Sequence, residues 1–270
     1  MLTIKNYVKA KSLSEAYELN QKKSNRIIGG MLWMKMSDKN IQTAIDLSDL
    51  GLDTIEETKD GFSIGCMVTL RQLELHEGLN SYTDNAIATS VKSIVGVQFR
   101  NLATIGGSIF GRYGFSDVLT MFLALDTQVE LYHAGIVSLS EFIYMPYDND
   151  ILVRIHVNKT PLKTVYLSHR NTKTDFPVIA CSVSDMGNFY RATVGARPSK
   201  AICIDVPNSV LSGKDSDENG VLFASYVTKH ITTGTNMRAS AEYRMHLANV
   251  LCKRGYLQLE QSKKTGGKKK

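Results

Sequence analysis

The stretch Arg100-Asn101-Leu102-Ala103-Thr104-Ile105-Gly106-Gly107-Ser108-Ile109-Phe110-Gly111-Arg112 decides how the rest of the chain is interpreted. Two adjacent glycines follow a β-favouring Ala-Thr-Ile run, and hydroxyl side chains stand on both sides, at Thr104 and Ser108. Because glycine has no Cβ, such a turn lets backbone N–H groups approach a ligand closely. Successive N–H groups in a turn form a concave site for an anion. The stretch therefore predicts an anion-binding turn.

A second pair of glycines lies far upstream, in Arg26-Ile27-Ile28-Gly29-Gly30-Met31-Leu32-Trp33. The first fifty residues predict strands at 3–8, 26–28 and 41–47 and a helix at 12–19, which Ser12 and Glu15 begin with a capping box. Gly29 and Gly30 thus follow a strand directly. Ligands of open α/β sheets bind at the carboxyl ends of strands. We expect the two glycine turns to hold one large phosphate-bearing ligand between them.

Size and composition indicate a globular protein of roughly two domains, since the chain has 270 residues, of which 43% are hydrophobic and 21% charged. The longest apolar run, 118–125, is shorter than the ~18 residues that span a bilayer. The N-terminus lacks the basic and apolar regions of a signal peptide. We expect a cytoplasmic protein with no membrane span.

The net charge of +6 is concentrated in lysines near the C-terminus, and 261–270 is predicted to be a disordered basic tail. No basic stripe with interleaved aromatic residues is present, which argues against binding to nucleic acid. The four cysteines have no zinc or iron–sulfur spacing and are expected to be reduced and structural. The six histidines are scattered. We therefore expect no metal site and no catalytic residues in this chain, so that any redox metal sits on another chain.

The middle of the chain predicts a hairpin at 54–65 around Lys59-Asp60-Gly61, a helix capped by Thr69, and a helix at 84–91. After Ser116-Asp117 come a helix to about 125, strands at 128–132 and 151–157, and a strand entering a short helix at 137–142. A turn at 159–161 opens the last part, with strands at 163–168, 176–183 and 190–195 and helices at about 221–231 and 240–258. Strands followed by helices predict an α+β domain with its helices on one face of an antiparallel sheet.

Taken in order, these motifs resemble the FAD-binding (medium) subunits of molybdenum hydroxylases, such as the flavin subunit of xanthine dehydrogenase and the medium chain of carbon monoxide dehydrogenase. The matching segments, which run from about residue 3 to 260, are Ile28–Trp33 for Ala-Gly-Gly-Thr-Asp-Leu, Ile64–Leu70 for Ile-Gly-Ala-x-x-Thr-Leu, Arg100–Ile109 for Arg-Asn-x-Ala-Thr-Ile-Gly-Gly-Asn-Ile, the pair Ser116-Asp117, Asp175–Val178 and Ser240–Arg244. These motifs, found together and in the same order, are far more specific than any one of them.

The resemblance implies an α+β fold: an FAD-binding domain of the vanillyl-alcohol-oxidase or PCMH type at 1–160, with subdomains at about 1–52 and 53–160, and a small α+β C-terminal domain of the CO-dehydrogenase flavoprotein type at 161–260. The two glycine loops would hold the pyrophosphate of FAD from opposite sides. The cofactor-binding residues that it implies are Ile28, Gly29, Gly30, Met31, Leu32, Trp33, Arg100, Asn101, Thr104, Ile105, Gly106, Gly107, Ser108, Ser116 and Asp117.

Several positions depart from the family pattern or allow two interpretations. Met31, Leu32 and Trp33 offer almost no hydroxyl or carboxylate, and Trp33 either packs on part of the ligand or fills core together with Leu32. The usual Ala-Ser-Pro before the Ser-Asp pair is replaced by 112–115. Arg100 either pairs with phosphate or forms a surface ion pair. Asp117 either contacts the ribose or flavin or is a helix N-cap.

The function that the resemblance implies is electron transfer in a complex of several subunits. Electrons would pass from a molybdenum–pterin centre on a large subunit, through iron–sulfur clusters on a small subunit, to FAD on this chain and then to NAD or another acceptor. Xanthine or another purine is the first expectation for the substrate. Two alternatives stay open: a self-contained FAD-dependent reductase on the same fold, and a non-catalytic assembly subunit without FAD.

Overall fold

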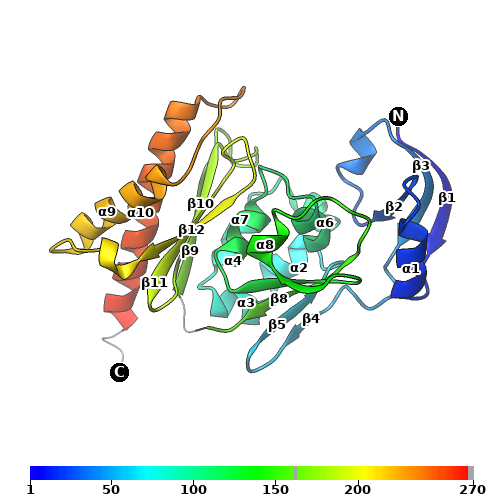
Figure 1. Cartoon of the computed structure of the whole chain (residues 1–270), viewed down its shortest axis with the longest axis horizontal. Coiled ribbons are helices and arrows are strands. Elements are labelled where there is room, and N and C mark those ends of the chain that lie inside the picture. The colour runs from blue at the N-terminus through cyan, green and yellow to red at the C-terminus, as the bar shows by residue number, and fades with distance from the viewer. Residues whose placement is uncertain (161–162, 267–270) are drawn as a thin grey trace. The chain divides into compact units, whose positions relative to one another are not determined.

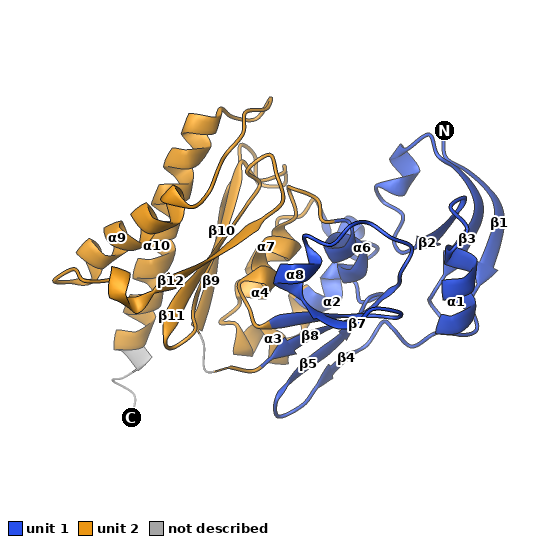
Figure 2. Cartoon of the chain, viewed as in Figure 1, with its two compact units in different colours: residues 1–73, 96–111, 127–158 blue, residues 74–95, 112–126, 159–270 orange. Residues whose placement is uncertain are grey.

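The computed structural model describes residues 1–160 and 163–266, with the side chains described through residue 264. Contacts divide the chain into two compact units (Figure 2): unit 1 comprises 1–73, 96–111 and 127–158, and unit 2 comprises 74–95, 112–126 and 159–270. Neither unit is a continuous stretch of sequence. The predicted domain boundaries at 52 and 160 stay a prediction, because grouping by contacts does not define domains along the chain.

Unit 1 begins with a small parallel sheet in the order β1-β3-β2 (Figure 1). Its elements are β1 (Thr3–Lys9), α1 (Leu13–Asn20), β2 (Asn25–Ile28), the 3-10 helix η1 (Met34–Met36) and β3 (Asn40–Asp46). Ser12 caps α1, since its hydroxyl accepts the N–H of Glu15 at 3.1 Å. The predicted order of strand, helix, strand, loop and strand is confirmed, and it places Gly29 and Gly30 directly after the carboxyl end of β2.

A five-stranded antiparallel sheet, in the order β4-β5-β8-β6-β7, forms the rest of unit 1. Its strands are β4 (Ile55–Glu57), β5 (Gly61–Gly65), β6 (Thr127–Leu131), β7 (Gly135–Ser138) and β8 (Leu152–Asn158), and its helices are α2 (Leu70–Leu75, which runs on into unit 2), α5 (Val97–Arg100), α6 (Ile105–Phe110) and α8 (Leu139–Phe142). Side chains alternate between the faces. Ile64, Val129 and Ile155 are completely buried, whereas His156 and Glu130 pair at 3.0 Å on the other face. Helix α6 packs against β8 and so is attached to this sheet.

Unit 2 contains a four-stranded antiparallel sheet in the order β12-β11-β10-β9. Its elements are α3 (Glu77–Tyr82), α4 (Ala86–Val91), α7 (Asp117–Leu123), β9 (Lys163–His169), β10 (Ile179–Asp185), β11 (Phe189–Gly195), β12 (Ile202–Pro207), the 3-10 helix η2 (Asn208–Val210), α9 (Ser216–Lys229) and α10 (Ala241–Gly266). The predicted turn at 159–161 ends on Pro161, which lies outside the described residues.

Helices cover both faces of this sheet: α9 and α10 pack on one face, as expected from the order of the last elements, and α4 and α7 cover the other (Figure 1). On one face Cys181 of β10 lies 3.4 Å from Cys252 of α10, measured between the sulfur atoms. On the other face the Thr193 hydroxyl of β11 donates to the carbonyl of Thr120 in α7 at 2.7 Å. The covering helices α4 and α7 precede the sheet in the sequence, and for this reason the order of the later elements alone does not reveal them.

The last helix is longer than expected. Helix α10 extends to Gly266, so the tail predicted from residue 261 is helical up to that point, and 267–270 lie outside the described residues. Within this extension the Lys263 ammonium group pairs with Asp185 at 2.6 Å and with Glu260 at 2.8 Å, which holds this part of α10 against β10. In the part of the chain that the structure describes, no helix has both the length and the apolar character needed to cross a bilayer.

Candidate functional site

The two glycine segments lie against each other in unit 1. A Cβ atom on Gly30 would lie 1.9 Å from the carbonyl oxygen of Leu102, and one on Gly29 would lie 2.8 Å from the Thr104 hydroxyl oxygen. Real Cβ atoms do not come so close to other atoms, and only glycine permits this approach of two backbones. The structure therefore brings the two predicted segments together.

The first glycine loop (residues 29–33) presents unused hydrogen-bond donors. The backbone N–H groups of Gly30, Met31 and Leu32 make no hydrogen bond to any residue that the structure describes. Met31 has φ +58°, in the left-handed region that side chains rarely adopt. Such a residue, followed by right-handed backbone, turns successive N–H groups toward a common point and creates an anion site. The carbonyl of Met31 accepts the N–H of Lys35 at 2.9 Å, which ties the loop to the following turn.

The second glycine segment (residues 104–108) is not the expected turn after a β run. It is the first turn of α6, and Thr104 is the N-cap. Its donors are already used: the N–H groups of Ile105, Gly106 and Gly107 donate to the carbonyls of Val68 and Cys66 and to the Thr104 hydroxyl, at 2.8, 2.9 and 3.1 Å. The Ser108 N–H and hydroxyl both donate to the Thr104 carbonyl. This segment therefore shapes the site without offering free N–H groups at these positions.

The two glycines of α6 serve different purposes. Gly106 is buried, and a Cβ there would lie 2.6 Å from the carbonyl oxygen of Cys66. Gly107 is exposed, and the one atom near its hypothetical Cβ is the Thr104 hydroxyl oxygen at 3.2 Å. Gly106 thus allows close packing inside unit 1, whereas Gly107 leaves open surface. Burial raises the pKa of the Cys66 thiol to about 12, so this neighbouring cysteine is not reactive.

The other predicted residues of unit 1 fall into buried and accessible groups. Ile28 and Ile105 are core residues, Leu32 is half-buried and Asn101 is exposed. Arg100, at the end of α5, is only 5% exposed, so it is not a surface residue. Trp33 is 37% exposed, so its ring does not simply fill core.

Ser116 and Asp117 belong to unit 2 and are engaged there. Ser116 is the N-cap of α7, since its hydroxyl accepts the N–H of Leu119 at 3.0 Å. The buried Asp117 carboxylate accepts hydrogen bonds from Arg170, at 2.6 Å, and from the Tyr166 hydroxyl. Burial raises the pKa of the Asp117 carboxyl, and the Arg170 guanidinium opposes that rise. The N-cap of α7 is therefore Ser116 and not Asp117.

Nothing in the sequence pointed to Tyr166 or Arg170 as partners of Asp117. They follow it by 49 and 53 residues, on β9 and directly after it. An isolated arginine carries no signal of which acid it will meet in the fold.

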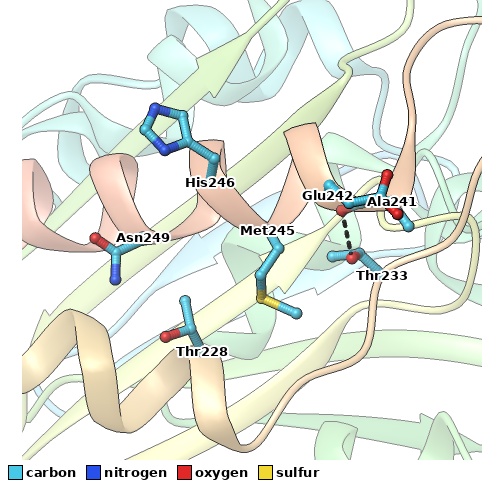
Figure 3. Close-up of a pocket in the computed structure, with 7 residues that line it drawn as sticks. All are labelled: Thr228, Thr233, Ala241, Glu242, Met245, His246 and Asn249. Carbon is cyan, nitrogen blue, oxygen red and sulfur yellow. Dashed lines mark hydrogen bonds between the residues drawn. The ribbon is translucent and has the colours of Figure 1, made fainter.

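Unit 2 also has an open groove of about 530 Å³ between the ends of α9 and α10 (Figure 3). Its polar groups do not converge on a point: the Thr233 hydroxyl donates to the carbonyl of Ala241 at 2.8 Å, and His246 points away from Thr228. Among the described residues there is no group of three or more His, Cys, Asp or Glu side chains that could hold a metal ion. The groove offers no arrangement suited to catalysis.

The chain is similar in sequence and in fold to known flavin-binding subunits and to chains of known oxidoreductases. The chain is 24% identical over 280 residues to the xanthine dehydrogenase FAD-binding subunit of Escherichia coli O157:H7, covering 94% of this chain and 95% of the relative. Its fold is similar to that of a chain of quinoline 2-oxidoreductase from Pseudomonas putida 86, with a TM-score of 0.83, 19% identity and coverage of 95% and 97%. It is similar as well to a chain of carbon monoxide dehydrogenase from Hydrogenophaga pseudoflava, with a TM-score of 0.81, 19% identity and the same coverage.

The strongest evidence of kinship is a family profile that matches residues 2–159, more than half of the chain. This range contains both glycine segments and the Ser116-Asp117 pair. The predicted α+β fold of the flavoprotein type and the predicted family are confirmed. The chain belongs to the family of FAD-binding domains in molybdopterin dehydrogenases.

Proposed function

We propose that this chain is the electron-transfer flavoprotein subunit of a molybdenum hydroxylase complex that acts on xanthine or a related purine. FAD carries the redox chemistry when it is bound, and the residues of this chain bind and orient it. The large partner subunit would hold a molybdenum–pterin centre and the small one iron–sulfur clusters, and NAD would be the acceptor. We place the complex in the cytoplasm, where the four free cysteines of this chain would stay reduced.

The observation that carries the proposal is the set of unused N–H groups at Gly30, Met31 and Leu32, beside the exposed Gly107 surface. Backbone donors can bind the two negative charges of a pyrophosphate without any cationic side chain. The site is thus suited to the phosphates of FAD. Thr104 would support it, since its hydroxyl holds the N–H of Gly107 and contacts the first loop at Gly29.

Purine as the substrate rests on one observation, the similarity along nearly the whole chain to a xanthine dehydrogenase FAD-binding subunit. No residue of this chain needs to contact that substrate, because the oxidation would take place at the molybdenum centre of a partner. Activity of the isolated complex toward xanthine, hypoxanthine and simple aldehydes, with NAD or a dye as acceptor, tests both assignments. A complex that oxidises aldehydes only would contradict the purine assignment and leave the flavin assignment intact.

The flavin assignment is tested by replacing Gly107 with valine. Because Gly107 is exposed and a Cβ there meets only the Thr104 hydroxyl oxygen, at 3.2 Å, valine should leave the fold largely intact but occupy the volume that the pyrophosphate needs. Purified wild-type protein should release about one FAD per chain on acid treatment, and Gly107→Val almost none. The matched control is Gly96→Val, since Gly96 has extended backbone with φ −135° and only the Gln98 side chain nearby, at 3.4 Å. This control should retain FAD.

Two outcomes separate the alternatives. A colourless, folded wild-type chain that binds no added FAD would indicate an assembly subunit and contradict the proposal. A chain that is fully active alone, without molybdenum or iron in its preparation, would indicate a self-contained reductase.

A further inference from the structure

Trp33, the only tryptophan of the chain, ends the first glycine loop. Its ring packs edge-on against Phe99 of α5, with 6.1 Å between the ring centroids and 68° between the planes. Its carbonyl accepts the N–H of Met36 at 3.1 Å, which fixes its backbone at the start of η1. The ring is thus held in place on one side while more than a third of its surface remains accessible.

The surroundings of this ring combine an anion site with apolar surface. The unused N–H groups of residues 30–32 immediately precede Trp33 in the loop. Leu102, two residues before the second segment, places its carbonyl against Gly30, and it is 50% exposed. The stretch 31–36 contains no hydroxyl and no carboxylate side chain. Apart from the indole N–H of Trp33 and the ammonium group of Lys35, the side chains of this stretch are apolar, which suits a flat apolar ring next to a phosphate.

We propose that Trp33 packs against the adenine ring of the dinucleotide whose pyrophosphate the first glycine loop binds, an inference that rests on the proposed function. The choice of ring follows from the covalent structure of FAD. One ribose separates adenine from its phosphate, whereas a five-carbon ribityl chain separates the flavin ring from the other phosphate. A side chain only one residue beyond the phosphate-binding N–H groups is thus within reach of adenine, the ring nearer to the phosphates.

The affinity of the site therefore comes largely from the AMP half of the ligand. ADP, which has the pyrophosphate and adenine, should bind without a flavin. FMN, which has one phosphate and the flavin but no adenine, should bind much more weakly. Replacing an aromatic side chain that stacks on a base by alanine typically weakens binding by about 5- to 150-fold.

The experiment uses the full chain freed of flavin. Because Trp33 is the sole tryptophan, its fluorescence reports on this site alone. ADP and FAD should change this fluorescence in a saturable manner, and FMN should not do so at the same concentrations. By calorimetry, Trp33→Ala should lose about tenfold in affinity for ADP and for FAD, whereas Trp33→Phe should stay within a few-fold of the wild type. Ile136→Ala, which shortens an exposed apolar side chain on β7, is the control and should change neither affinity.

The outcomes distinguish this inference from the proposed function. If the wild type binds FAD but Trp33→Ala binds ADP as tightly as the wild type, Trp33 does not contact adenine and only this inference is wrong. If Trp33→Ala weakens FMN and not ADP, the ring against Trp33 is the flavin. If the wild type binds neither FAD nor ADP, the proposed function itself fails. Should Trp33→Ala not fold, the response of wild-type fluorescence to ADP and the affinity of Trp33→Phe still decide the question.

Discussion

The two glycine segments share a sequence signature but use it in opposite ways. Both place a Gly-Gly pair after residues of high β propensity, and both suggested backbone donors for phosphate. In the first loop the N–H groups of Gly30, Met31 and Leu32 have no acceptor among the described residues. In the second segment the N–H groups of residues 105–108 are all satisfied within unit 1.

The difference shows that a glycine pair marks a place where another group comes very close to the backbone. That group can be another segment of the protein and need not be a ligand. Gly30 approaches the carbonyl of Leu102 and Gly106 approaches that of Cys66, so these two glycines bring protein segments together. Next to them, Gly107 is exposed and Met31 is half-buried, so these positions still have accessible surface to offer a ligand. Substitutions at four positions test this division.

The largest effect is expected at the contact between the segments. Gly30→Ala would place a methyl group 1.9 Å from the Leu102 carbonyl oxygen, and because the obstacle is backbone it cannot rotate away. We expect a loss of about 3 kcal/mol in the free energy of unfolding, together with loss of bound flavin. Urea denaturation followed by circular dichroism measures the first, and the absorbance of the purified protein measures the second. Unchanged stability would mean that the two segments do not pack as described.

The neighbouring glycines of α6 should respond with opposite signs. Gly106→Ala would bring a methyl group to 2.6 Å from the carbonyl oxygen of Cys66 and should destabilise the protein by about 2 kcal/mol. Gly107→Ala makes one tight contact, 3.2 Å from the Thr104 hydroxyl oxygen, which a small shift of that side chain relieves. Since alanine has the higher helix propensity, this variant should stabilise α6 by about 0.5 kcal/mol. The two variants differ by one position and serve as controls for each other in the same denaturation experiment. Equal effects would contradict the distinction between a packing glycine and a surface glycine.

The smallest effect is expected at Thr104, the N-cap of α6, whose hydroxyl accepts the N–H of Gly107. Thr104→Val removes the oxygen that accepts the N–H of Gly107 and should cost about 1 kcal/mol of stability, whereas Thr104→Ser keeps the cap. Because the first loop supplies the phosphate donors, we expect the affinity for ADP to change less than twofold in either variant. A clear gain in ADP affinity for Thr104→Val would show that a free Gly107 N–H binds phosphate. The second segment would then supply a phosphate donor, which contradicts our assignment of these donors to the first loop alone.

Much of the fold could be predicted because its signals are local. The capped helix α1, the hairpin of β4 and β5 and the strand preceding Gly29 all follow from patterns within a few residues, and the structure has them within a residue or two of the predicted bounds. The beginning of α6 was missed for an equally local reason. Ala-Thr-Ile favours a strand and glycine disfavours a helix, and these preferences concealed the role of Thr104 as an N-cap.

The rest of the site depends on contacts between distant residues and could not be predicted. Whether a backbone N–H is free depends on acceptors elsewhere, such as the carbonyls of Cys66 and Val68, which lie about forty residues before α6 in the sequence. In the same way the ion pair of Asp117 with Arg170 joins positions 53 residues apart. A motif identifies the residues near a ligand, but the surrounding fold decides which of their atoms remain available to bind it.

The two-sided cover of the sheet in unit 2 has a consequence for how the protein is made. Ser182 and Thr193 are completely buried under α7, which is synthesised well before β10 and β11 leave the ribosome. The bond from Thr193 to Thr120 spans 73 residues of chain, and contacts of such separation form slowly. The apolar surface of α4 and α7 that faces this sheet therefore stays uncovered until β9, β10 and β11 have been synthesised. A fragment that begins at residue 159 would lack them altogether and expose that face of the sheet to aggregation.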